Sequence, residues 1–233
     1  MLKKIFNGFA SFALPKSCLC CDGILEDSRE FICEECHAKL TPFTDEHPWK
    51  EENIRDGNID NSFSLYWFVE GTEIQTMLHA LKYEKMKSVG TLFGREIGER
   101  ILEMCGTKFD FVVPVPLHRS KERERTYNQS SYICKGIGEA AGAEVLDDCL
   151  KRTRFTPSQT KLDKQQRKEN MDKAFKVKKS YMGKLKGKNI IIADDVITTG
   201  ATILECARTL KSAGCGKIII CSIAYARLDN EML

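Results

Sequence analysis

The sequence lacks a long hydrophobic run, an internal repeat and a low-complexity tract. No uninterrupted apolar stretch reaches about 18 residues, the length that a transmembrane helix needs, so a membrane span is excluded. Hydrophobic residues make up 42% and charged residues 30% of the 233 residues, a balance typical of globular proteins without extensive disorder. A chain of this length suits one ordinary domain, or one domain with a small appended module.

Two common nucleotide-binding patterns are also missing. No strand is followed by a loop that ends in Gly-Lys-Ser or Gly-Lys-Thr, so ordinary NTPase chemistry is not expected. No Gly-x-Gly-x-x-Gly follows a strand either, so the sequence does not support a dinucleotide-binding fold.

The net charge is small, but its distribution is uneven. The whole chain carries +3 at pH 7, which argues neither for nor against a nucleic-acid partner. Residues 151–188 hold 14 Lys and Arg against 3 Asp and Glu, a local charge of +11, and the rest of the chain carries −8. Because one segment concentrates the positive potential, we expect it to face phosphate or another polyanion. For any single lysine in this segment, a solvated basic surface is the alternative.

Cysteine is abundant, with 11 residues. Six of them are scattered through apolar segments, which fits reduced thiols in the cytosol, because a free cysteine packs as a small hydrophobe. These six are Cys105, Cys134, Cys149, Cys206, Cys215 and Cys221. The other five crowd into residues 18–36.

The crowded segment contains two C-x2-C pairs, Cys18 with Cys21 and Cys33 with Cys36. Each pair closes a tight turn, so the four thiolates can meet around one tetrahedral zinc ion. Four protein ligands leave no open coordination position, which indicates a structural metal rather than a catalytic one. Cys20 is the spare thiol. The alternative is a set of free thiols or an adventitious disulfide.

We divide the chain into three parts. Residues 1–45 would form an N-terminal helix and the four-cysteine zinc module, residues 46–105 a linker and a hood-like strand and helix region, and residues 106–233 an α/β domain. Residues 1–15 follow helical spacing and predict a short amphipathic helix, with a signal peptide as the alternative. Residues 41–61 are polar and contain two prolines, which predicts a loop or linker.

Short apolar strands alternate with helices from residue 109 onward. This alternation predicts a parallel, doubly wound α/β sheet. The expected strands are residues 109–115, 143–150, 188–193 and 217–224, with helices at 127–141 and 201–213. Upstream we expect a strand at 62–69 and helices at 72–84 and 90–104, the last with Leu92, Phe93, Ile97, Ile101 and Leu102 on its buried face.

The strongest motif runs from Ile190 to Thr202, where an apolar strand ends in Asp194 and Asp195 and a Thr/Gly loop opens a helix. Ligands bind at this edge of open α/β sheets. The loop amides and the positive end of the helix predict a phosphate cradle. The adjacent carboxylates repel each other unless a ribose diol or a magnesium ion shares them. The alternative is that the acids only cap the helix, which needs one acid rather than two.

This element resembles the phosphoribosyl-pyrophosphate-binding loop of type I phosphoribosyltransferases. The resemblance implies that Asp194 and Asp195 are the catalytic acids, which hold the ribose hydroxyls. The loop that follows would bind the 5′-phosphate, and it consists of Thr198, Thr199, Gly200, Ala201 and Thr202.

Further residues resemble one branch of these proteins, the ComF (ComFC) family. The stretch from Val113 to His118 reads VPVPLH and ends a strand, as the family's pyrophosphate loop does. It is followed by the arrangement Arg123-x-Arg125-x-Tyr127-Asn128-Gln129. Leu81-Lys82-Tyr83 and a four-cysteine module ahead of the transferase domain also match. Thr126 departs from the pattern, in which we expect glycine.

The resemblance adds substrate-binding residues outside the Thr/Gly loop. Residues 152–170 would be the flexible loop that closes over the site, and its basic side chains would contact pyrophosphate. The residues implied are Pro116, Leu117, His118, Arg123, Arg125 and Lys161. Magnesium would accompany the phosphoribosyl pyrophosphate, in addition to the structural zinc.

Two functions of different classes follow from the resemblance. In the first, the protein binds phosphoribosyl pyrophosphate or a related ribose phosphate and takes part in DNA uptake during competence. Single-stranded DNA and a helicase-like competence protein would be its partners, in the cytoplasm or at the inner face of the membrane. In the second, it is an active phosphoribosyltransferase of the amidophosphoribosyl or nucleobase type in nucleotide metabolism. That enzyme would be a glycosyltransferase in which a nitrogen nucleophile displaces pyrophosphate from C1 of the ribose.

Overall fold

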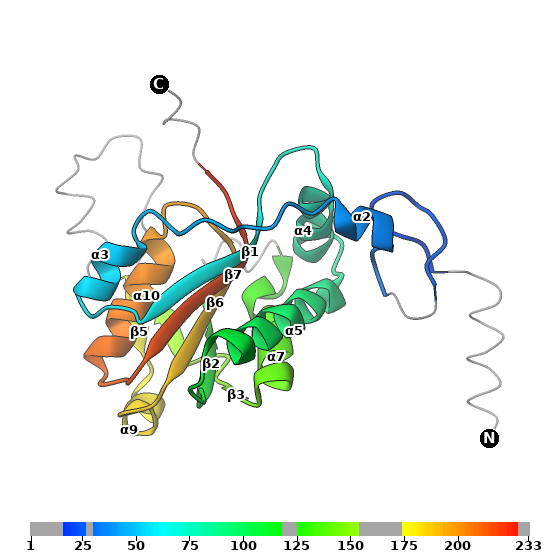
Figure 1. Cartoon of the computed structure of the whole chain (residues 1–233). Coiled ribbons are helices and arrows are strands. Elements are labelled where there is room, and N and C mark those ends of the chain that lie inside the picture. The colour runs from blue at the N-terminus through cyan, green and yellow to red at the C-terminus, as the bar shows by residue number, and fades with distance from the viewer. Residues whose placement is uncertain (1–15, 27–29, 118–124, 154–173, 228–233) are drawn as a thin grey trace, which may run out of the picture.

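A five-stranded parallel sheet forms the centre of the computed structural model, which describes residues 16–26, 30–117, 125–153 and 174–227 (Figure 1). The strands are arranged in the order β1-β7-β6-β2-β3. Their bounds are β1 Asn61–Trp67, β2 Phe111–Pro114, β3 Glu144–Val145, β6 Ile190–Ile197 and β7 Ile218–Tyr225. Every neighbouring pair in this sheet runs parallel. The expected parallel α/β sheet is therefore confirmed.

Helices cover both faces of this sheet, with α4, α5 and α7 on one face and α3 and α10 on the other (Figure 1). Their bounds are α3 Lys50–Arg55, α4 Glu73–Tyr83, α5 Lys87–Met104, α7 Gln129–Ala141 and α10 Ala201–Ser212. Because strands covered on both sides bury every side chain, they read as continuous apolar runs. Ile191 packs in the core under α5 and α7, whereas Ile190 and Ile192 pack in the core under α10.

The helices α5 and α7 cross with their backbones in contact. A Cβ atom on Gly94 would lie 2.2 Å from the carbonyl oxygen of Ile133, and one on Gly136 would lie 2.1 Å from that of Thr91. Two backbones can approach this closely only where side chains are absent, so both positions require glycine. The crossing fixes the position of α7, whose N-terminal end carries residues of the candidate site.

The N-terminal module packs on the same face of the sheet as α4 and α5. It contains α2 (Glu34–Ala38) and a short antiparallel bridge between Ser17 and Ile24. Ile32 and Leu40 belong to one buried core with residues of α4 and α5. In Figure 1 the module lies at the edge of the molecule, beyond α4. It is therefore attached to the body by apolar packing as well as by the chain.

Two expected boundaries differ in the structure. The polar segment 41–61 contains the helix α3 and is not only a loop. The expected strand 143–150 is interrupted, because Asp147 and Asp148 form a turn after β3. The chain then forms β4 (Leu150–Arg152), which pairs antiparallel with β5 (Phe175–Val177) in a separate two-stranded sheet.

One residue of the expected buried face of α5 points elsewhere. Leu102 is 56% exposed, whereas Ile101 is buried. Successive helical residues are about 100° apart around the axis, so the residue after a fully buried one turns away from the core.

The remaining elements follow β5. They are the short 3-10 helix η1 (Lys179–Tyr181) and α9 (Met182–Leu185). The amphipathic helix expected at residues 1–15 lies outside the described residues. Among the helices that the structure describes, none has both the length and the apolar character required to cross a membrane.

Candidate functional site

The acid pair lies within β6 and not beyond its end. We expected the strand to stop at the acids, but β6 continues to Ile197 because its parallel pairing with β7 extends that far. The hydroxyl of Ser130 on α7 donates a hydrogen bond to Asp194 Oδ1 at 2.9 Å. The ammonium Nζ of Lys82 on α4 lies 3.2 Å from Asp195 Oδ2. Two different helices therefore hold the two carboxylates.

The environment of Asp194 shifts its ionisation toward neutral pH. Burial, followed by the negative charge of Asp195, raises the pKa of Asp194 to about 7. The Ser130 hydroxyl, the backbone N–H of Asp195 and the charge of Lys82 act in the opposite direction. A bound hydroxyl donor or cation would favour the ionised form of this carboxyl. The pair is therefore suited to a ribose diol or to a magnesium ion.

Residues 198–202, called the 198–202 loop from here on, comprise the connection from β6 to α10 and the first two residues of that helix. Thr198 and Thr199 are exposed, whereas Gly200 is buried and has a φ of 75° at the N-cap of α10. The Thr199 hydroxyl accepts a hydrogen bond from the backbone N–H of Ala201 at 3.4 Å. The N-cap glycine has no side chain that could bond the next N–H groups. These next N–H groups of α10 are therefore available to an anion.

A second wall of the site joins the end of α4 to the segment before α7. The Tyr127 hydroxyl donates a hydrogen bond to the carbonyl oxygen of Leu81. Arg125 donates from Nη2 to the Tyr83 hydroxyl and from Nη1 to Gln129 Oε1, both at 3.2 Å. Its guanidinium also lies over the Tyr83 ring, 5.2 Å from the ring centre. The predicted substrate-binding residue Arg125 is thus held in place by the segment that also carries Lys82.

The turn before α7 is strained at one residue. Thr126 has a φ of 64°, in the left-handed region. A β-branched residue is rarely found there, whereas glycine adopts it freely. This is the position where the family pattern led us to expect glycine, so the chain keeps the turn without the residue that suits it. Two residues later, Asn128 accepts a hydrogen bond from the Ser130 N–H and donates one to the Val115 carbonyl oxygen at 3.0 Å.

The other predicted substrate-binding residues follow β2, the strand that pairs with β6, or cannot be placed. Pro116 and Leu117 follow β2 and line a cavity of about 690 Å³, to which Arg152 and Lys178 also contribute. Neither acid is among the described residues that line this cavity. His118, Arg123 and Lys161 lie outside the described residues.

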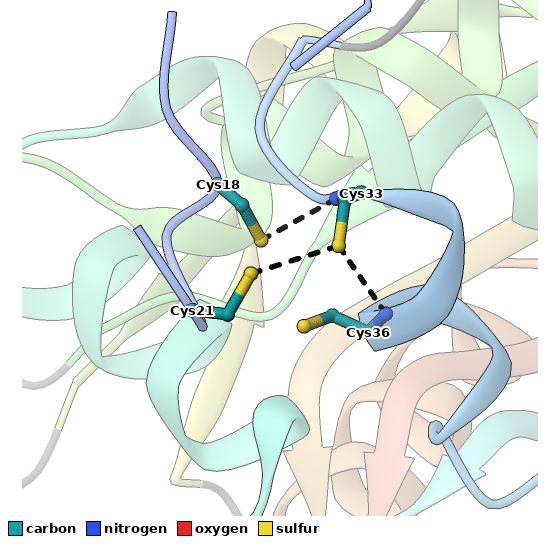
Figure 2. A group of neighbouring side chains, drawn as sticks. All are labelled: Cys18, Cys21, Cys33 and Cys36. Carbon is teal, nitrogen blue, oxygen red and sulfur yellow. Dashed lines mark hydrogen bonds between the residues drawn. The ribbon is translucent and has the colours of Figure 1, made fainter. Parts of the chain in front are cut away.

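The four predicted metal ligands meet at one point. Figure 2 shows the sulfur atoms of Cys18, Cys21, Cys33 and Cys36 pointing toward one another, and all four lie within 4.8 Å of each other. Cys21 Sγ and Cys33 Sγ are 3.7 Å apart. The Cys20 thiol instead points to the Glu73 carbonyl oxygen at 3.9 Å. Cys20 is therefore outside the group, as expected.

Backbone N–H groups surround the sulfur atoms. Cys18 Sγ accepts hydrogen bonds from the N–H groups of Cys20 and Cys33, and Cys33 Sγ accepts one from Cys36, each at 3.4 Å (Figure 2). Burial raises the pKa of the Cys18 thiol, but these N–H donors outweigh it and lower the pKa to about 6. The thiolate is the form that binds metal. Four such sulfurs could hold a metal ion such as zinc.

All eleven cysteines lie in the described part of the chain, and none forms a disulfide. Within the predicted group of six scattered thiols, four are buried, namely Cys134, Cys149, Cys206 and Cys221. Burial raises the pKa of the Cys149 thiol to about 12, so this thiol is uncharged at neutral pH. These residues act as small core hydrophobes, as their positions in the sequence indicated.

Comparison with known proteins agrees with this geometry. The phosphoribosyl transferase domain matches residues 143–232, which include β6, the 198–202 loop and α10. Competence protein F of Haemophilus influenzae is 29% identical over 115 residues, covering 49% of this chain and 50% of that protein. Competence protein ComFC of Bacillus subtilis is 25% identical over 206 residues, covering 85% of this chain and 79% of that protein. The chain is therefore similar to ComFC over most of its length.

A further relative carries a different description. DNA utilization protein YhgH of Escherichia coli is 27% identical to this chain over 149 residues, which cover 62% of the chain. The matched part spans 64% of the length of that relative, just under two thirds. The name of this relative refers to DNA, and the names of the other two refer to competence.

Sequence reasoning gave no role to three residues that hold the site. Lys82 pairs with Asp195, Ser130 donates to Asp194, and Trp49 lies against Gly200. Lys82 was quoted only as part of a resemblance, and no spacing signal connects it to an acid in a distant strand. Ser130 sits at the second position of α7, where a serine reads as an ordinary helix start. These contacts arise from the tertiary fold alone.

Proposed function

We propose that this protein binds phosphoribosyl pyrophosphate, or a related ribose 5-phosphate, at the carboxyl end of β6. The observation that supports this best is the acid pair beside the start of α10, whose N-cap is a glycine. Asp194 and Asp195 would accept hydrogen bonds from the ribose hydroxyls. The N–H groups of the 198–202 loop and α10 would hold the 5′-phosphate. Arg125, at the second wall, would face the pyrophosphate group.

Magnesium suits the same site, because it prefers hard oxygen donors such as the carboxylates of Asp194 and Asp195. With phosphoribosyl pyrophosphate bound, the ion would neutralise negative charge on the pyrophosphate. The chain's own part is to orient the sugar through the acids and the phosphate through the loop. Lys82 would balance the charge of Asp195 until the ligand enters.

Calorimetry with ribose 5-phosphate, and with phosphoribosyl pyrophosphate plus magnesium, tests this binding. Asp195→Asn and Thr199→Ala should each weaken binding at least about tenfold, because charge-assisted contacts contribute roughly 1.5–3 kcal/mol. Asp56→Asn, at an exposed residue after α3, is the matched control and should bind like the wild type. Wild-type affinity in both site variants would reject the assignment.

We infer a role in DNA uptake during competence from the cavity beside the site together with the family. Basic side chains of Lys151, Arg152 and Lys178 line it with the rings of Tyr127 and Tyr132. Cations interleaved with aromatic rings are what single-stranded DNA requires for backbone contacts and base stacking. The predicted helicase-like partner and the location at the inner face of the membrane stay predictions.

A salt titration against labelled single-stranded DNA tests direct binding. Replacing Lys151 and Lys178 by alanine should flatten the log–log salt dependence by about 1.4, at ~0.7 per phosphate contact. The change Lys39→Ala, at a lysine of the N-terminal module, should leave the slope unchanged. If the wild-type protein does not bind the strand even at low salt, direct DNA binding is wrong.

The second candidate is the active phosphoribosyltransferase. The same acid pair supports this candidate, because it would position the ribose. The acceptor itself would displace pyrophosphate, so the reaction requires no nucleophile from the protein. A pyrophosphate-release assay with magnesium, phosphoribosyl pyrophosphate and a panel of bases and amines separates it from a binding role. Release that depends on one acceptor would establish turnover, and its absence across the panel together with tight binding would favour the binding protein.

We propose that the metal held by the four cysteines is zinc and that its role is structural. The support is a set of four sulfur donors with N–H groups directed at them, which leaves no open position for a substrate. Elemental analysis of purified protein tests the identity of the metal.

A further inference from the structure

Trp49, from the segment between the N-terminal module and α3, lies directly against the 198–202 loop. A Cβ atom on Gly200 would lie 2.4 Å from both Nε1 and Cε2 of the Trp49 indole and 2.9 Å from its Cζ2. The indole therefore occupies the space that any side chain at residue 200 would need. Gly200 also has a φ of 75°, so both the contact and the backbone conformation require glycine.

Aromatic stacking holds the indole from behind. The His47 ring lies parallel to it, with ring centres 4.7 Å apart and an interplanar angle of 7°. Phe43 stacks on His47 at 5.1 Å and 22°. His47 is fixed in turn, because its Nδ1 is hydrogen-bonded to Ser62 Oγ at 2.9 Å and its Nε2 to Ser64 Oγ at 3.0 Å. Trp49 is thus the end of a stack that is anchored in β1.

The edge of the indole that meets Gly200 is its N–H edge. Trp49 Nε1 is buried and has no hydrogen-bond partner among the described residues. A buried donor without an acceptor is rare in proteins, since it loses its bond to water without replacement. Here the N–H edge lies against Gly200 at the N-cap of α10, where the backbone N–H groups of the first helical turn also gather. All of these dipoles favour an anion at the loop.

We propose that Trp49 is a positioning residue for the phosphate of the ligand. It fixes Gly200 in the left-handed turn from which the N–H groups of α10 converge, and its N–H edge adds positive potential beneath the bound phosphate. The inference rests on the proposed binding of a ribose 5-phosphate at this loop. It assigns a binding role to a segment that the sequence marked only as a linker.

Tryptophan fluorescence provides the first test, because the chain has only two tryptophans, Trp49 and Trp67. Both contact the same aromatic group, since the Trp67 ring lies 4.8 Å from that of Phe43. Titration with ribose 5-phosphate should change the emission of the wild type and of Trp67→Phe. It should leave the emission of Trp49→Phe unchanged. If the emission change persists in Trp49→Phe and disappears in Trp67→Phe, the inference is overturned.

Affinity provides the second test and separates positioning from general stability. Trp49→Leu should weaken ribose 5-phosphate binding about tenfold or more by calorimetry, as small displacements of binding groups do. Trp67→Leu removes a comparable ring from the same aromatic group and should keep wild-type affinity, even if both variants melt at a lower temperature. Equal affinities in the two variants would reject the role of Trp49.

A milder variant covers the case in which Trp49→Leu does not fold. Trp49→Phe keeps an aromatic ring but loses the N–H group, and we expect a loss of affinity of about threefold to tenfold, the range of one hydrogen-bond donor. Wild-type affinity in Trp49→Phe would remove the N–H part of the proposal. If the wild-type protein does not bind ribose 5-phosphate, the proposed function itself is rejected. If it binds with an affinity that does not depend on Trp49, only the role of Trp49 is rejected.

Discussion

Lys82 and Asp195 form an ion pair across the candidate site, with Nζ 3.2 Å from Oδ2 and side-chain exposures of 20% and 14%. Lys82 comes from α4, and Asp195 comes from β6. The helix α4 therefore contributes to the electrostatics of the site. The positive charge of Lys82 also lowers the pKa of Asp194.

Removing this charge should move the pH dependence of ligand binding. Burial and Asp195 hold the pKa of Asp194 at about 7, so affinity for ribose 5-phosphate should rise as the pH increases through 7 and Asp194 ionises. In Lys82→Met the opposing charge is lost, so the midpoint should shift to higher pH. Calorimetry between pH 6 and pH 9 measures both. Lys188→Met, at a lysine paired with Asp110 elsewhere, should keep the wild-type midpoint.

Asp194→Asn should stabilise the fold at alkaline pH while it weakens ligand binding. The folded-state pKa of Asp194 is raised, so the stabilising effect of its neutral form is complete below the unfolded value and is lost as the pH rises through about 7. Asparagine keeps the acceptor for Ser130 and never ionises. We expect its free energy of unfolding to exceed that of the wild type by at least about 1 kcal/mol at pH 8, since one pKa unit corresponds to ~1.4 kcal/mol.

Urea denaturation of both proteins at pH 5 and pH 8 measures the effect. The difference should be smaller at pH 5 than at pH 8, because the stabilising effect is lost progressively between the unfolded pKa, near 4, and about 7. Groups away from the acid pair titrate alike in the two proteins, so the change in the difference isolates the ionisation of the pair. A difference that is equal at both pH values would show that the ionisation of Asp194 is not its cause.

Cys33→Ser should lose the metal and most of the soluble protein. The thiol of Cys33 is both a predicted ligand and the N-cap acceptor of α2, so its loss removes the metal and the start of that helix. Cys20→Ser is the matched control, because its thiol lies outside the group, and it should keep a single zinc per chain. Metal analysis and melting curves with and without chelator give the readout. Unchanged melting of metal-free wild-type protein would reject a structural zinc.

Thr126→Gly should stabilise the protein slightly. The left-handed conformation costs an L-residue about 1–2 kcal/mol, and glycine avoids this cost but loses roughly 0.5–1 kcal/mol through its greater freedom in the unfolded chain. The net gain should lie between about 0 and 1.5 kcal/mol. Denaturant unfolding measures it, with Thr126→Ala as the comparison that keeps the strain. A less stable glycine variant would indicate that the threonine side chain makes a contact that compensates for the strain.

The parts of the site that adjacent residues build were readable from the sequence. The acid pair and the 198–202 loop form one strand–loop–helix unit, and the four cysteines lie on two short turns, so local spacing was enough. Contacts between distant segments were not readable. Trp49 reaches Gly200, and Lys82 reaches Asp195, only after the sheet has formed. The polar composition of residues 41–61 predicted a linker, since composition does not show that His47 and Trp49 stack inward.

The crossing of α5 and α7 has a consequence for motion. Their backbones touch at Gly94 and Gly136, so no layer of side chains lies between them that could rearrange. Sliding one helix along the other would push a neighbouring side chain into backbone atoms, and the two helices must therefore move together. Ser130 is carried on this unit with its hydrogen bond to Asp194. The contact between Ser130 and Asp194 is therefore set by a pair of helices and not by one helix alone.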